Sequence, residues 1–414
     1  MLQSRGLRAG PSHLLVMNKT RKFDVIIVGA GPAGGLTGYY LAREGLAVLI
    51  LDRETLPRYK ACGGGLTRRT LDSLPFDISS VIEDYVCTPR LSLGTEPIFS
   101  KTYANPLIVL VMRDRFDHFI IENAIKAGAT VRDGTAFRSV AGTAGNLTIE
   151  TSAGAFRTGF LVGGDGVNSR VRKALNLDIR RKVMTALEAE IPRDDAGVPR
   201  DVGHSVDFDF GVIPEGYGWV FPKRECISAG VVSQSRKIHD VKHHLYSYLR
   251  SKQLHPDFDK IFIKGHLIPY MPAKSNSYAC DRGLVVGDAA GFTDPVTGEG
   301  IYYAVRGARV AADCILKYGK NSHDMPQAYD TALKSEFVDD LHYAARIGRL
   351  FYKLPVLSFR IASTFADRIA DSYAKVIAGQ MSYKQLFRER FSTRGLIRLC
   401  GTELLTRNEK IRKS

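Results

Sequence analysis

Two short runs of hydrophobic residues near the start of the chain, Val25–Val28 and Ala47–Leu51, flank a glycine-rich turn and a stretch of helical character. A short apolar run bounded by turn residues is typical of a buried strand. The first run leads into Gly29-Ala30-Gly31-Pro32-Ala33-Gly34, and the second ends on Asp52. The pattern therefore predicts a strand, a glycine turn, a helix, a second strand and a terminal acid.

This order is the dinucleotide-binding fingerprint in its structural context. Gly29 allows the tight turn, Gly31 lets the backbone approach a pyrophosphate, and Gly34 lets the helix pack closely on the strand. The start of the helix offers free N–H groups and a positive dipole end to the phosphates. Asp52, which follows Gly29 by 23 residues, is expected to accept hydrogen bonds from a ribose. We therefore predict a nucleotide site.

Further along, the pattern predicts alternating strands and helices and then a mostly β region. A helix is expected over Phe116–Ala127, because Gly128 ends it. Strands are then expected at Thr130–Val131, Phe137–Val140, Leu147–Glu150, Ala155–Thr158 and Phe160–Val162. The pattern in residues 183–277 predicts a mostly β region with one helix over about 237–253. Its strands are expected at Leu187–Ile191, Val206–Ile213, Trp219–Pro222, Ile227–Val232 and His266–Tyr270. A long helix is expected from Ile301, and further helices from about residue 330.

Two later strands also end in glycine turns that carry an acid. Phe160–Val162 runs into Gly163-Gly164-Asp165-Gly166, and Gly283–Val286 runs into Gly287-Asp288. Ligands of doubly wound sheets lie outside the carboxyl ends of the strands, so all three turns can meet one extended cofactor. The alternative is that two of them are ordinary tight turns.

Two other segments have unusual composition. Cys62 precedes three consecutive glycines, Gly63–Gly65, which allow the backbone to approach a flat or bulky group; a flexible linker is the alternative. Tyr217, Trp219 and Phe221 alternate along one expected strand and therefore point to one face. Such a face suits an apolar ligand, although it could also be the core face of a sheet.

Together these segments resemble the FAD-dependent oxidoreductases of the p-hydroxybenzoate hydroxylase fold and, within them, the geranylgeranyl reductase family. The resemblance covers roughly residues 23–330. GAGPAG with Asp52 is similar to the ADP-binding motif, GGDGVNSRVR to the DG motif and GLVVGDAAGFTDPVTGEG to the GD motif. KACGGGL resembles the cysteine–glycine loop of the reductases, and Pro214–Pro222 matches their PxxYxWxFP motif.

The resemblance implies an α/β fold, with a Rossmann-like three-layer FAD-binding domain of the glutathione reductase/p-hydroxybenzoate hydroxylase type. A mostly antiparallel β-sheet substrate domain is inserted into it, and a helical C-terminal segment follows. We expect the FAD-binding domain to comprise residues 23–85, 105–180 and 278–330, and the substrate domain to comprise 86–104 and 181–277. Residues 1–22 are expected to form a basic N-terminal tail, and 331–414 a basic helical segment.

The resemblance also implies roles for individual residues. FAD would be bound by Gly29, Gly31, Pro32, Ala33, Gly34, Asp52, Arg53, Cys62, Gly63, Arg113, Asp165, Gly287, Asp288, Pro295, Gly298, Gly300 and Ile301. The prenyl substrate would be held by Tyr217, Trp219, Phe221 and Pro222, and the reaction would take place beside Cys62, Gly63 and Gly64. Cys62 is the candidate proton source, but it could equally be a packed small residue.

The implied reaction is saturation of C=C bonds in a geranylgeranyl or polyprenyl chain, carried by a lipid, quinone, chlorophyll or diphosphate, through hydride transfer from reduced flavin. The chain has no second Rossmann fingerprint for a nicotinamide, and proteins of this fold often bind the reductant without one, so NADPH, NADH or a ferredoxin could supply the electrons. The main alternative is an NAD(P)H-dependent flavin monooxygenase acting on an aromatic or lipid substrate. A quinone-linked dehydrogenase and a protein that uses FAD structurally are further alternatives.

Composition limits the partners. The 414-residue chain carries a net charge of +15, which favours anionic partners, but no nucleic-acid module is recognisable and no nucleic acid is expected. Six scattered cysteines without a CxxC pair argue against a metal site and a disulfide framework, and suit a reducing compartment. No apolar run is long enough to span a bilayer. We expect a cytoplasmic monomer whose start is Met1 or Met17.

Much of the positive charge lies near the C-terminus. Residues 341–414 contain 15 Lys and Arg against 5 Asp and Glu. Apolar residues alternate with these charges at Leu350, Phe351, Leu354, Val356, Leu357, Phe359, Ile361 and Phe365. A basic amphipathic helix can lie on an anionic membrane, so peripheral membrane contact is one expectation. Packing of these helices on their own domain is the other.

Overall fold

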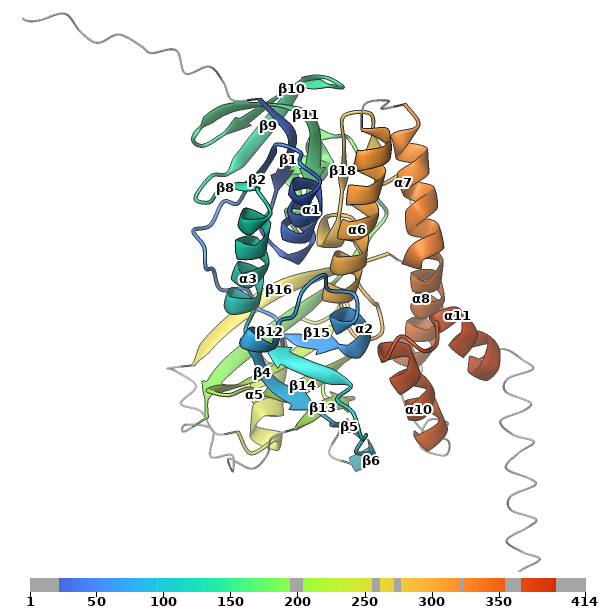
Figure 1. The fold of residues 1–414 in the computed structure, drawn as a ribbon. Helices are drawn as coiled ribbons and strands as arrows, with labels where there is room; N and C mark the ends of the chain where they lie inside the picture. The colour runs from blue at the N-terminus through green and yellow to red at the C-terminus, as the bar shows by residue number, and fades with distance from the viewer. Residues whose placement is uncertain are drawn as a thin grey trace, which may run out of the picture.

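The computed structural model describes residues 22–94, 96–193, 204–254, 261–271, 277–319, 323–353 and 366–391. Figure 1 shows one group of strands and helices in the upper part of the molecule and a second sheet in the lower part. Helices of the C-terminal third run down one side and connect the two parts.

The upper sheet contains eight strands within the described ranges and is parallel at its centre. Its order is β17-β18-β11-β1-β2-β8, with the hairpin β9–β10 paired to β11. The strands are β1 (Lys22–Val28), β2 (Val48–Leu51), β8 (Thr130–Arg132), β9 (Phe137–Thr143), β10 (Asn146–Thr151), β11 (Gly154–Gly163), β17 (Ala279–Cys280) and β18 (Gly283–Val285). Because β1, β2, β11 and β18 run parallel, their carboxyl ends and the turns that follow lie at one edge of the sheet.

Helices pack on this sheet through small residues. α1 (Pro32–Arg43) contacts β1 and β2 and lies between α3 (Arg113–Lys126) and α6 (Ile301–Tyr318), while α7 (Met325–Leu333) packs on α6. The apolar side chains of the sheet and of these helices form the largest hydrophobic core among the described residues, in which residues such as Ile26, Leu36 and Ile120 are fully buried. A short helix, α4 (Arg170–Ala174), follows β11, and the 3₁₀ turn η2 (Gly287–Ala289) follows β18.

The lower sheet has seven described strands in the order β16-β12-β15-β14-β13-β5-β6. Its neighbours are antiparallel except β13 and β5. The strands are β5 (Thr88–Leu93), β6 (Glu96–Ser100), β12 (Lys182–Pro192), β13 (Ser205–Phe210), β14 (Gly216–Pro222), β15 (Cys226–Ser233) and β16 (Phe262–Tyr270). One face packs on α5 (Val241–Ser251) around Leu245 and Tyr248, so the other face is free to line a cavity.

Between the sheets lies a small three-stranded sheet of β3 (Gly65–Thr67), β7 (Ile108–Val111) and β4 (Ile82–Val86). The helix α2 (Arg68–Leu71) follows β3, and the 3₁₀ turn η1 (Ser79–Val81) precedes β4. β3 begins at the last glycine of the Cys62 loop, and its pairing with β7 fixes the position of that loop.

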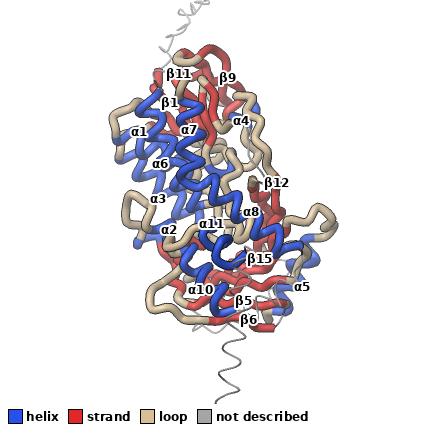
Figure 2. Tube along the Cα trace, turned by 90° about the vertical axis from the view of Figure 1, so that its right-hand side faces the viewer, coloured by secondary structure: helices blue, strands red, loops and turns tan. Residues whose placement is uncertain are grey.

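The C-terminal helices cover the side of the lower sheet. They are α8 (Asp339–Lys353), α10 (Ala366–Ile377) and α11 (Tyr383–Leu386), with π-helical turns at Lys334–Val338 and Phe387–Phe391. Figure 2 shows α10 beside β5 and β6, with α11 and α8 next to one another above it. Among the described helices, none is long and apolar enough to cross a bilayer. The apolar residues that favour membrane contact lie outside the described residues from Leu354 to Phe365, as do the side chains of Leu350 and Phe351.

The predicted α/β fold class is confirmed, as is the long helix that begins at Ile301. The prediction of two strands over 155–162 is wrong, because β11 continues through Gly159 while it pairs with β1 and β10. The expected helix at 116 begins earlier, at Arg113, whose guanidinium pairs with Asp117 one turn later. The helix expected over 237–253 is shorter, and the strand expected to reach Ile213 ends before Gly211, whose φ is +78°.

Candidate active site

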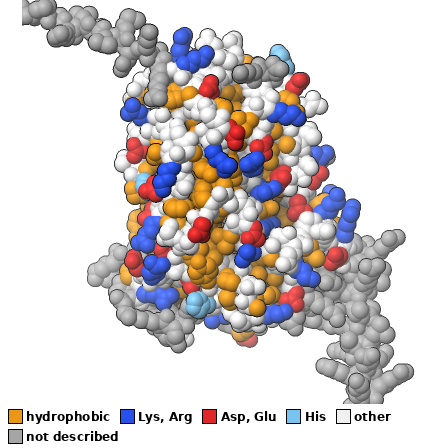
Figure 3. All heavy atoms as spheres, viewed as in Figure 1, with side chains coloured by type: hydrophobic (Ala, Val, Ile, Leu, Met, Phe, Trp, Pro, Cys, Tyr) orange, Lys and Arg blue, Asp and Glu red, His pale blue; other side chains and the backbone are white. Residues whose placement is uncertain are grey.

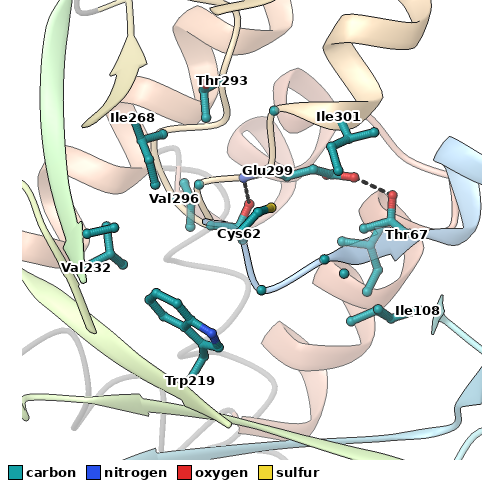
Figure 4. Close-up of a pocket in the computed structure, with 18 of the residues that line it drawn as sticks. Cys62, Thr67, Ile108, Trp219, Val232, Ile268, Thr293, Val296, Glu299 and Ile301 are labelled. Carbon is teal, nitrogen blue, oxygen red and sulfur yellow. Dashed lines mark hydrogen bonds between the residues drawn. The ribbon is translucent and has the colours of Figure 1, made fainter. Parts of the chain in front are cut away.

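A cavity of about 350 Å³ lies where the edge of the upper sheet meets the lower sheet and the C-terminal helices. Its surface is mostly apolar, and its volume is within the range of small-molecule sites. In Figure 4, Trp219 and Val232 on the lower sheet lie across this space from Cys62, Val296 and Ile301. Of the predicted site residues, those on its wall are Gly31, Pro32, Ala33, Cys62, Gly63, Gly64, Arg113, Tyr217, Trp219, Phe221, Gly287, Asp288, Gly298, Gly300 and Ile301.

The first two glycine turns pack directly against each other. Gly29 has φ +107°, and a Cβ atom there would lie 2.2 Å from the carbonyl oxygen of Gly164. A Cβ atom on Gly34 would lie 1.9 Å from the carbonyl oxygen of Gly29. The amide of Gly164 donates to the carbonyl of Val28 at 2.8 Å. Gly29 and Gly34 therefore shape the turns and do not lie on the cavity wall, whereas Gly31 does.

Two helices begin at this cavity, and the free N–H groups at each start can bind an anionic or electron-rich ligand. Their N-cap residues are glycines, Gly31 for α1 and Gly300 for α6, so no N-cap side chain occupies the first N–H groups. A Cβ atom on Gly31 would meet only the Arg58 guanidinium, at 3.5 Å, so backbone is open to a ligand there. The start of α1 can bind a pyrophosphate, and that of α6 can bind a flavin carbonyl. The residues present therefore fit FAD.

Asp52 and Arg53 lie away from the cavity wall. The Asp52 carboxylate is buried and accepts hydrogen bonds from the amides of Ala30 (2.7 Å) and Glu54 (3.0 Å). The Arg58 guanidinium lies 3.6 Å from it. Arg53 is exposed, and its guanidinium lies 3.2 Å from Glu54. In this structure Asp52 stabilises the first glycine turn, and its predicted contact with a ribose stays a prediction.

Three other predicted site residues also lie off the cavity. Asp165 is turned toward α4, where it accepts hydrogen bonds from the Ser169 hydroxyl (2.5 Å) and the amide of Arg170 (2.7 Å). Burial raises the pKa of the Asp165 carboxyl, although these hydrogen bonds oppose the rise. Pro295 presents its carbonyl to Gln234 at 2.8 Å. Pro222 ends β14 beyond the cavity.

Charged groups gather at the polar end of the cavity. Lys60 Nζ lies 3.7 Å and His266 Nε2 lies 4.0 Å from the Asp288 carboxylate. Burial alone would raise the pKa of Asp288, but Lys60, His266 and Arg113 outweigh it and lower the pKa to about 2. The buried Arg113 guanidinium is itself held by two contacts with Asp117, at 2.8 and 2.9 Å. Asp288 is therefore an anion in the folded protein across the neutral range.

The Cys62 loop lies against the aromatic face of β14. A Cβ atom on Gly63 would lie 2.9 Å from the Phe221 ring and 3.1 Å from Trp219 Nε1. Tyr217, Trp219 and Phe221 all line the cavity, whereas Val220 packs with Tyr248 of α5 on the opposite face. The alternation predicted from the sequence is thus confirmed. The Tyr217 hydroxyl donates to the carbonyl of Thr297, which joins this face to the loop before α6.

Sequence reasoning missed a large part of the apolar wall. Residues from the β5–β7 region and from the C-terminal helices complete it, namely Leu91, Ile98, Phe99, Tyr103, Leu107, Ile108, Ile347, Tyr373, Ala374, Ile377 and Leu386. No local motif marks them, because they come together only when α10 packs beside β6.

A buried charge cluster beside the cavity was also missed. Arg69 contacts Glu299 at 2.5 Å and Asp294 at 3.8 Å, and the hydroxyls of Thr67 and Tyr383 donate to Glu299 and Asp294. Burial raises the pKa of Asp294, and Arg69 opposes that rise. Figure 4 shows the Thr67–Glu299 hydrogen bond next to Ile301 at the start of α6. Glu299 lies within the recognised glycine motif, which could have drawn attention to it.

These features define an FAD-dependent oxidoreductase with an apolar cavity beside its glycine turns. A sequence model described as "FAD binding domain" matches residues 22–320. The chain belongs to this FAD-binding family, and geranylgeranyl reductases are among its relatives. The predicted family and the predicted FAD cofactor are thereby confirmed.

Relatives match along most of the chain. An uncharacterised protein of Methanosarcina barkeri is 35% identical, over 84% of this chain and 89% of that protein. The chloroplastic geranylgeranyl diphosphate reductase of Nicotiana tabacum is 27% identical, over 90% of this chain and 83% of its own length. The digeranylgeranylglycerophospholipid reductase of Methanosphaerula palustris is 26% identical, over 94% of this chain and 96% of its own length.

The fold also matches a crystal structure. A geranylgeranyl bacteriochlorophyll reductase-like protein of Thermoplasma acidophilum superposes with a TM-score of 0.69 at 23% identity, covering 89% of this chain and 98% of that one. The flavin-dependent brominase Bmp2 superposes with a TM-score of 0.68 at 19% identity. At such identities the likeness concerns the fold alone, since reductases and halogenases share it.

Proposed function

We propose that this protein saturates C=C bonds of a geranylgeranyl or longer polyprenyl chain and takes its electrons from NADPH, NADH or a ferredoxin. The observation that carries the proposal is the apolar cavity that opens between the glycine turns and the aromatic face of β14. An apolar chain buried there gains stability in proportion to the area removed from water. The names of the tobacco and archaeal relatives support the same substrate class.

Different residues of the cavity would bind the cofactor and the substrate. Gly31, Pro32 and Ala33 at the start of α1, with Gly300 and Ile301 at the start of α6, would hold FAD. When bound there and reduced, FAD would supply the hydride for one carbon of the alkene. The aromatic face of β14 and the apolar wall would fix the prenyl chain and exclude water, which lowers the entropic part of the barrier. Cys62 stays a candidate proton source on the same wall.

We also propose that the protein acts as a monomer and contacts anionic membranes at its periphery, where prenyl lipids reside. The excess of 15 Lys and Arg over 5 Asp and Glu in residues 341–414 supports this contact. Figure 3 shows apolar side chains running down the middle of one face of the molecule, with charged side chains on both flanks. Cosedimentation with vesicles of anionic and of neutral lipids tests the contact.

Mass spectrometry of prenyl compounds tests the function. Lipids, quinones and prenyl diphosphates from cells with and without the gene are compared, and one prenyl pool is expected to gain two hydrogens per reduced bond when the gene is present. Unchanged saturation in every pool would overturn the proposal. The monooxygenase alternative instead predicts NAD(P)H-dependent oxygen consumption and a product heavier by one oxygen atom.

A further inference from the structure

Glu188 on β12 is an acid buried in the wall of the cavity. Its side chain lines the cavity, and the residue is only 2% exposed. Oε1 accepts a hydrogen bond from the Ser228 hydroxyl at 2.6 Å. Oε2 has no hydrogen-bond partner among the described residues. A buried carboxyl oxygen without a partner is costly, so its retention needs an explanation.

A short hydrogen-bond chain joins this acid to the aromatic face. The indole Nε1 of Trp219 donates to the Ser228 oxygen at 3.2 Å, and the Ser228 hydroxyl donates to Glu188. Trp219 also lies against Gly63 of the Cys62 loop. The acid is therefore held in a fixed orientation at the place where the loop, the aromatic face and the cavity meet.

Charged and titratable groups surround Glu188 on several elements. Lys264 on β16 is its direct cross-strand neighbour and also lines the cavity. Lys223, after β14, is 1% exposed, and its Nζ has no hydrogen-bond partner among the described residues. Glu190 lies two residues along β12 and is half-buried. Tyr59 and Cys62 approach from the loop after β2.

The balance of these groups favours the neutral acid. Burial raises the pKa of Glu188 and the charge of Glu190 adds to the rise, whereas Lys223, the Ser228 hydroxyl and the backbone N–H of Cys62 only partly oppose it. A neutral carboxyl has one O–H group to donate. Because Oε1 accepts from Ser228, that O–H group belongs on Oε2, the oxygen that has no hydrogen-bond partner among the described residues.

We propose that Glu188 is the catalytic proton donor for the reduced double bond. This assignment rests on the proposed function. The Glu188 O–H bond breaks, and a C–H bond forms at one alkene carbon, while the other carbon receives the hydride that the reduced flavin supplies. The C=C π bond is lost, and Glu188 is left as a carboxylate. Lys223 and the Ser228 hydroxyl stabilise that carboxylate until a proton from solvent restores the acid.

The assignment separates Glu188 from Cys62, the donor suggested by the sequence. Both line the cavity. Glu188 has a hydrogen-bond partner on one oxygen and an unpartnered second oxygen among the described residues, whereas the Cys62 thiol faces the Arg113 guanidinium, a cation that cannot resupply a proton. Substitution by Gln keeps the size and the Ser228 contact of the side chain while it removes the acidic proton.

The test compares the FAD-loaded wild type with Glu188→Gln and with the matched control Glu190→Gln, whose acid lies on the same strand but off the cavity. Each protein is reduced by dithionite without oxygen and mixed with geranylgeranyl diphosphate. We expect the single-turnover rate of Glu188→Gln to fall at least ~100-fold, which is the usual contribution of a general acid. The single-turnover rate of Glu190→Gln is expected to stay within ~3-fold of the wild-type rate, because only removal of the proton-donating acid itself abolishes general-acid catalysis.

Infrared spectroscopy supplies a readout independent of turnover. Near neutral pH, the spectrum of the wild type minus Glu188→Gln should contain the C=O band of a neutral carboxyl, and an ionised Glu188 would overturn the assignment. A wild-type rate in Glu188→Gln would also overturn it, as would loss of proton transfer in Cys62→Ala alone. In those cases the proposed function stands, because wild type still saturates the probe. A wild type that saturates no prenyl probe refutes the proposed function itself.

Discussion

The Nη2 atom of Arg69 lies 2.5 Å from the Oε2 atom of Glu299, and each side chain is only 7% exposed. Arg69 belongs to α2, just after the Cys62 loop and β3, whereas Glu299 precedes α6. Thr67 and Thr70 donate to the other oxygen of Glu299. This ion pair joins the two segments that form opposite sides of the candidate flavin pocket.

Substitution of Arg69 by Leu should strongly destabilise the fold. It would leave Glu299 and Asp294 buried without their cation, which costs about 3–5 kcal/mol of unfolding free energy. The neighbouring Arg68→Leu is the control, because its pair with Asp72 is half-exposed, and a change below about 1 kcal/mol is expected. Urea unfolding measures both. Similar losses in the two variants would show that the buried pair has no special role.

Substitution of Gly29 by Ala should weaken both the fold and FAD binding. The residue has φ +107°, and the added Cβ would lie 2.2 Å from the Gly164 oxygen. Left-handed strain and the clash together should cost about 3 kcal/mol. We expect the purified variant to contain less flavin by absorbance.

Gly45→Ala separates the two causes. Gly45 also has a positive φ, +84°, but nothing lies within 4 Å of an added Cβ. Its cost should therefore be about 1 kcal/mol from strain alone, with normal flavin content. If Gly45→Ala lost as much flavin as Gly29→Ala, contact between the two turns would not explain the effect.

The glycine turns and the aromatic strand could be predicted from the sequence because each is a local pattern. Gly31 and Trp219 reach the cavity as expected, since the strand end fixes the place of the Gly31 backbone and the two-residue alternation fixes where the Trp219 side chain points. Asp52 shows the limit of the same reasoning. Its position after β2 was anticipated, but its carboxylate turns to the amides of Ala30 and Glu54.

The rest of the site depends on contacts between segments far apart in the chain. Arg69 meets Glu299 across 230 positions, and Glu188 meets Ser228 across 40. Neither pair has a spacing that a single sequence reveals. Tyr373 enters the cavity because α10 packs beside β6, and tertiary packing of this kind leaves no local motif.

Substitution of Phe221 by Leu should weaken binding of the prenyl chain. Phe221 lies on the cavity face of β14. The substitution would remove about 1 kcal/mol of contact between the aromatic ring and the prenyl chain, so KM for geranylgeranyl diphosphate should rise about fivefold to tenfold. Val220→Ala on the opposite face is the control. It should lower stability by about 2 kcal/mol, because it leaves a gap against α5, and leave KM unchanged. A larger effect on KM from Val220→Ala than from Phe221→Leu would place the substrate elsewhere.

Asp288 should make the protein sensitive to acid. Its folded-state pKa of about 2 is below the ordinary value of 3.8, so the ionised carboxylate stabilises the fold above about pH 4, and this contribution of about 2 kcal/mol is lost as the pH falls through 2. In Asp288→Asn, the loss of unfolding free energy between about pH 5 and pH 2 should shrink by that amount. Asp313→Asn is the control, since its pair with Arg309 is exposed. Urea titrations at several pH values measure the effect, and an unchanged acid dependence in Asp288→Asn would contradict it.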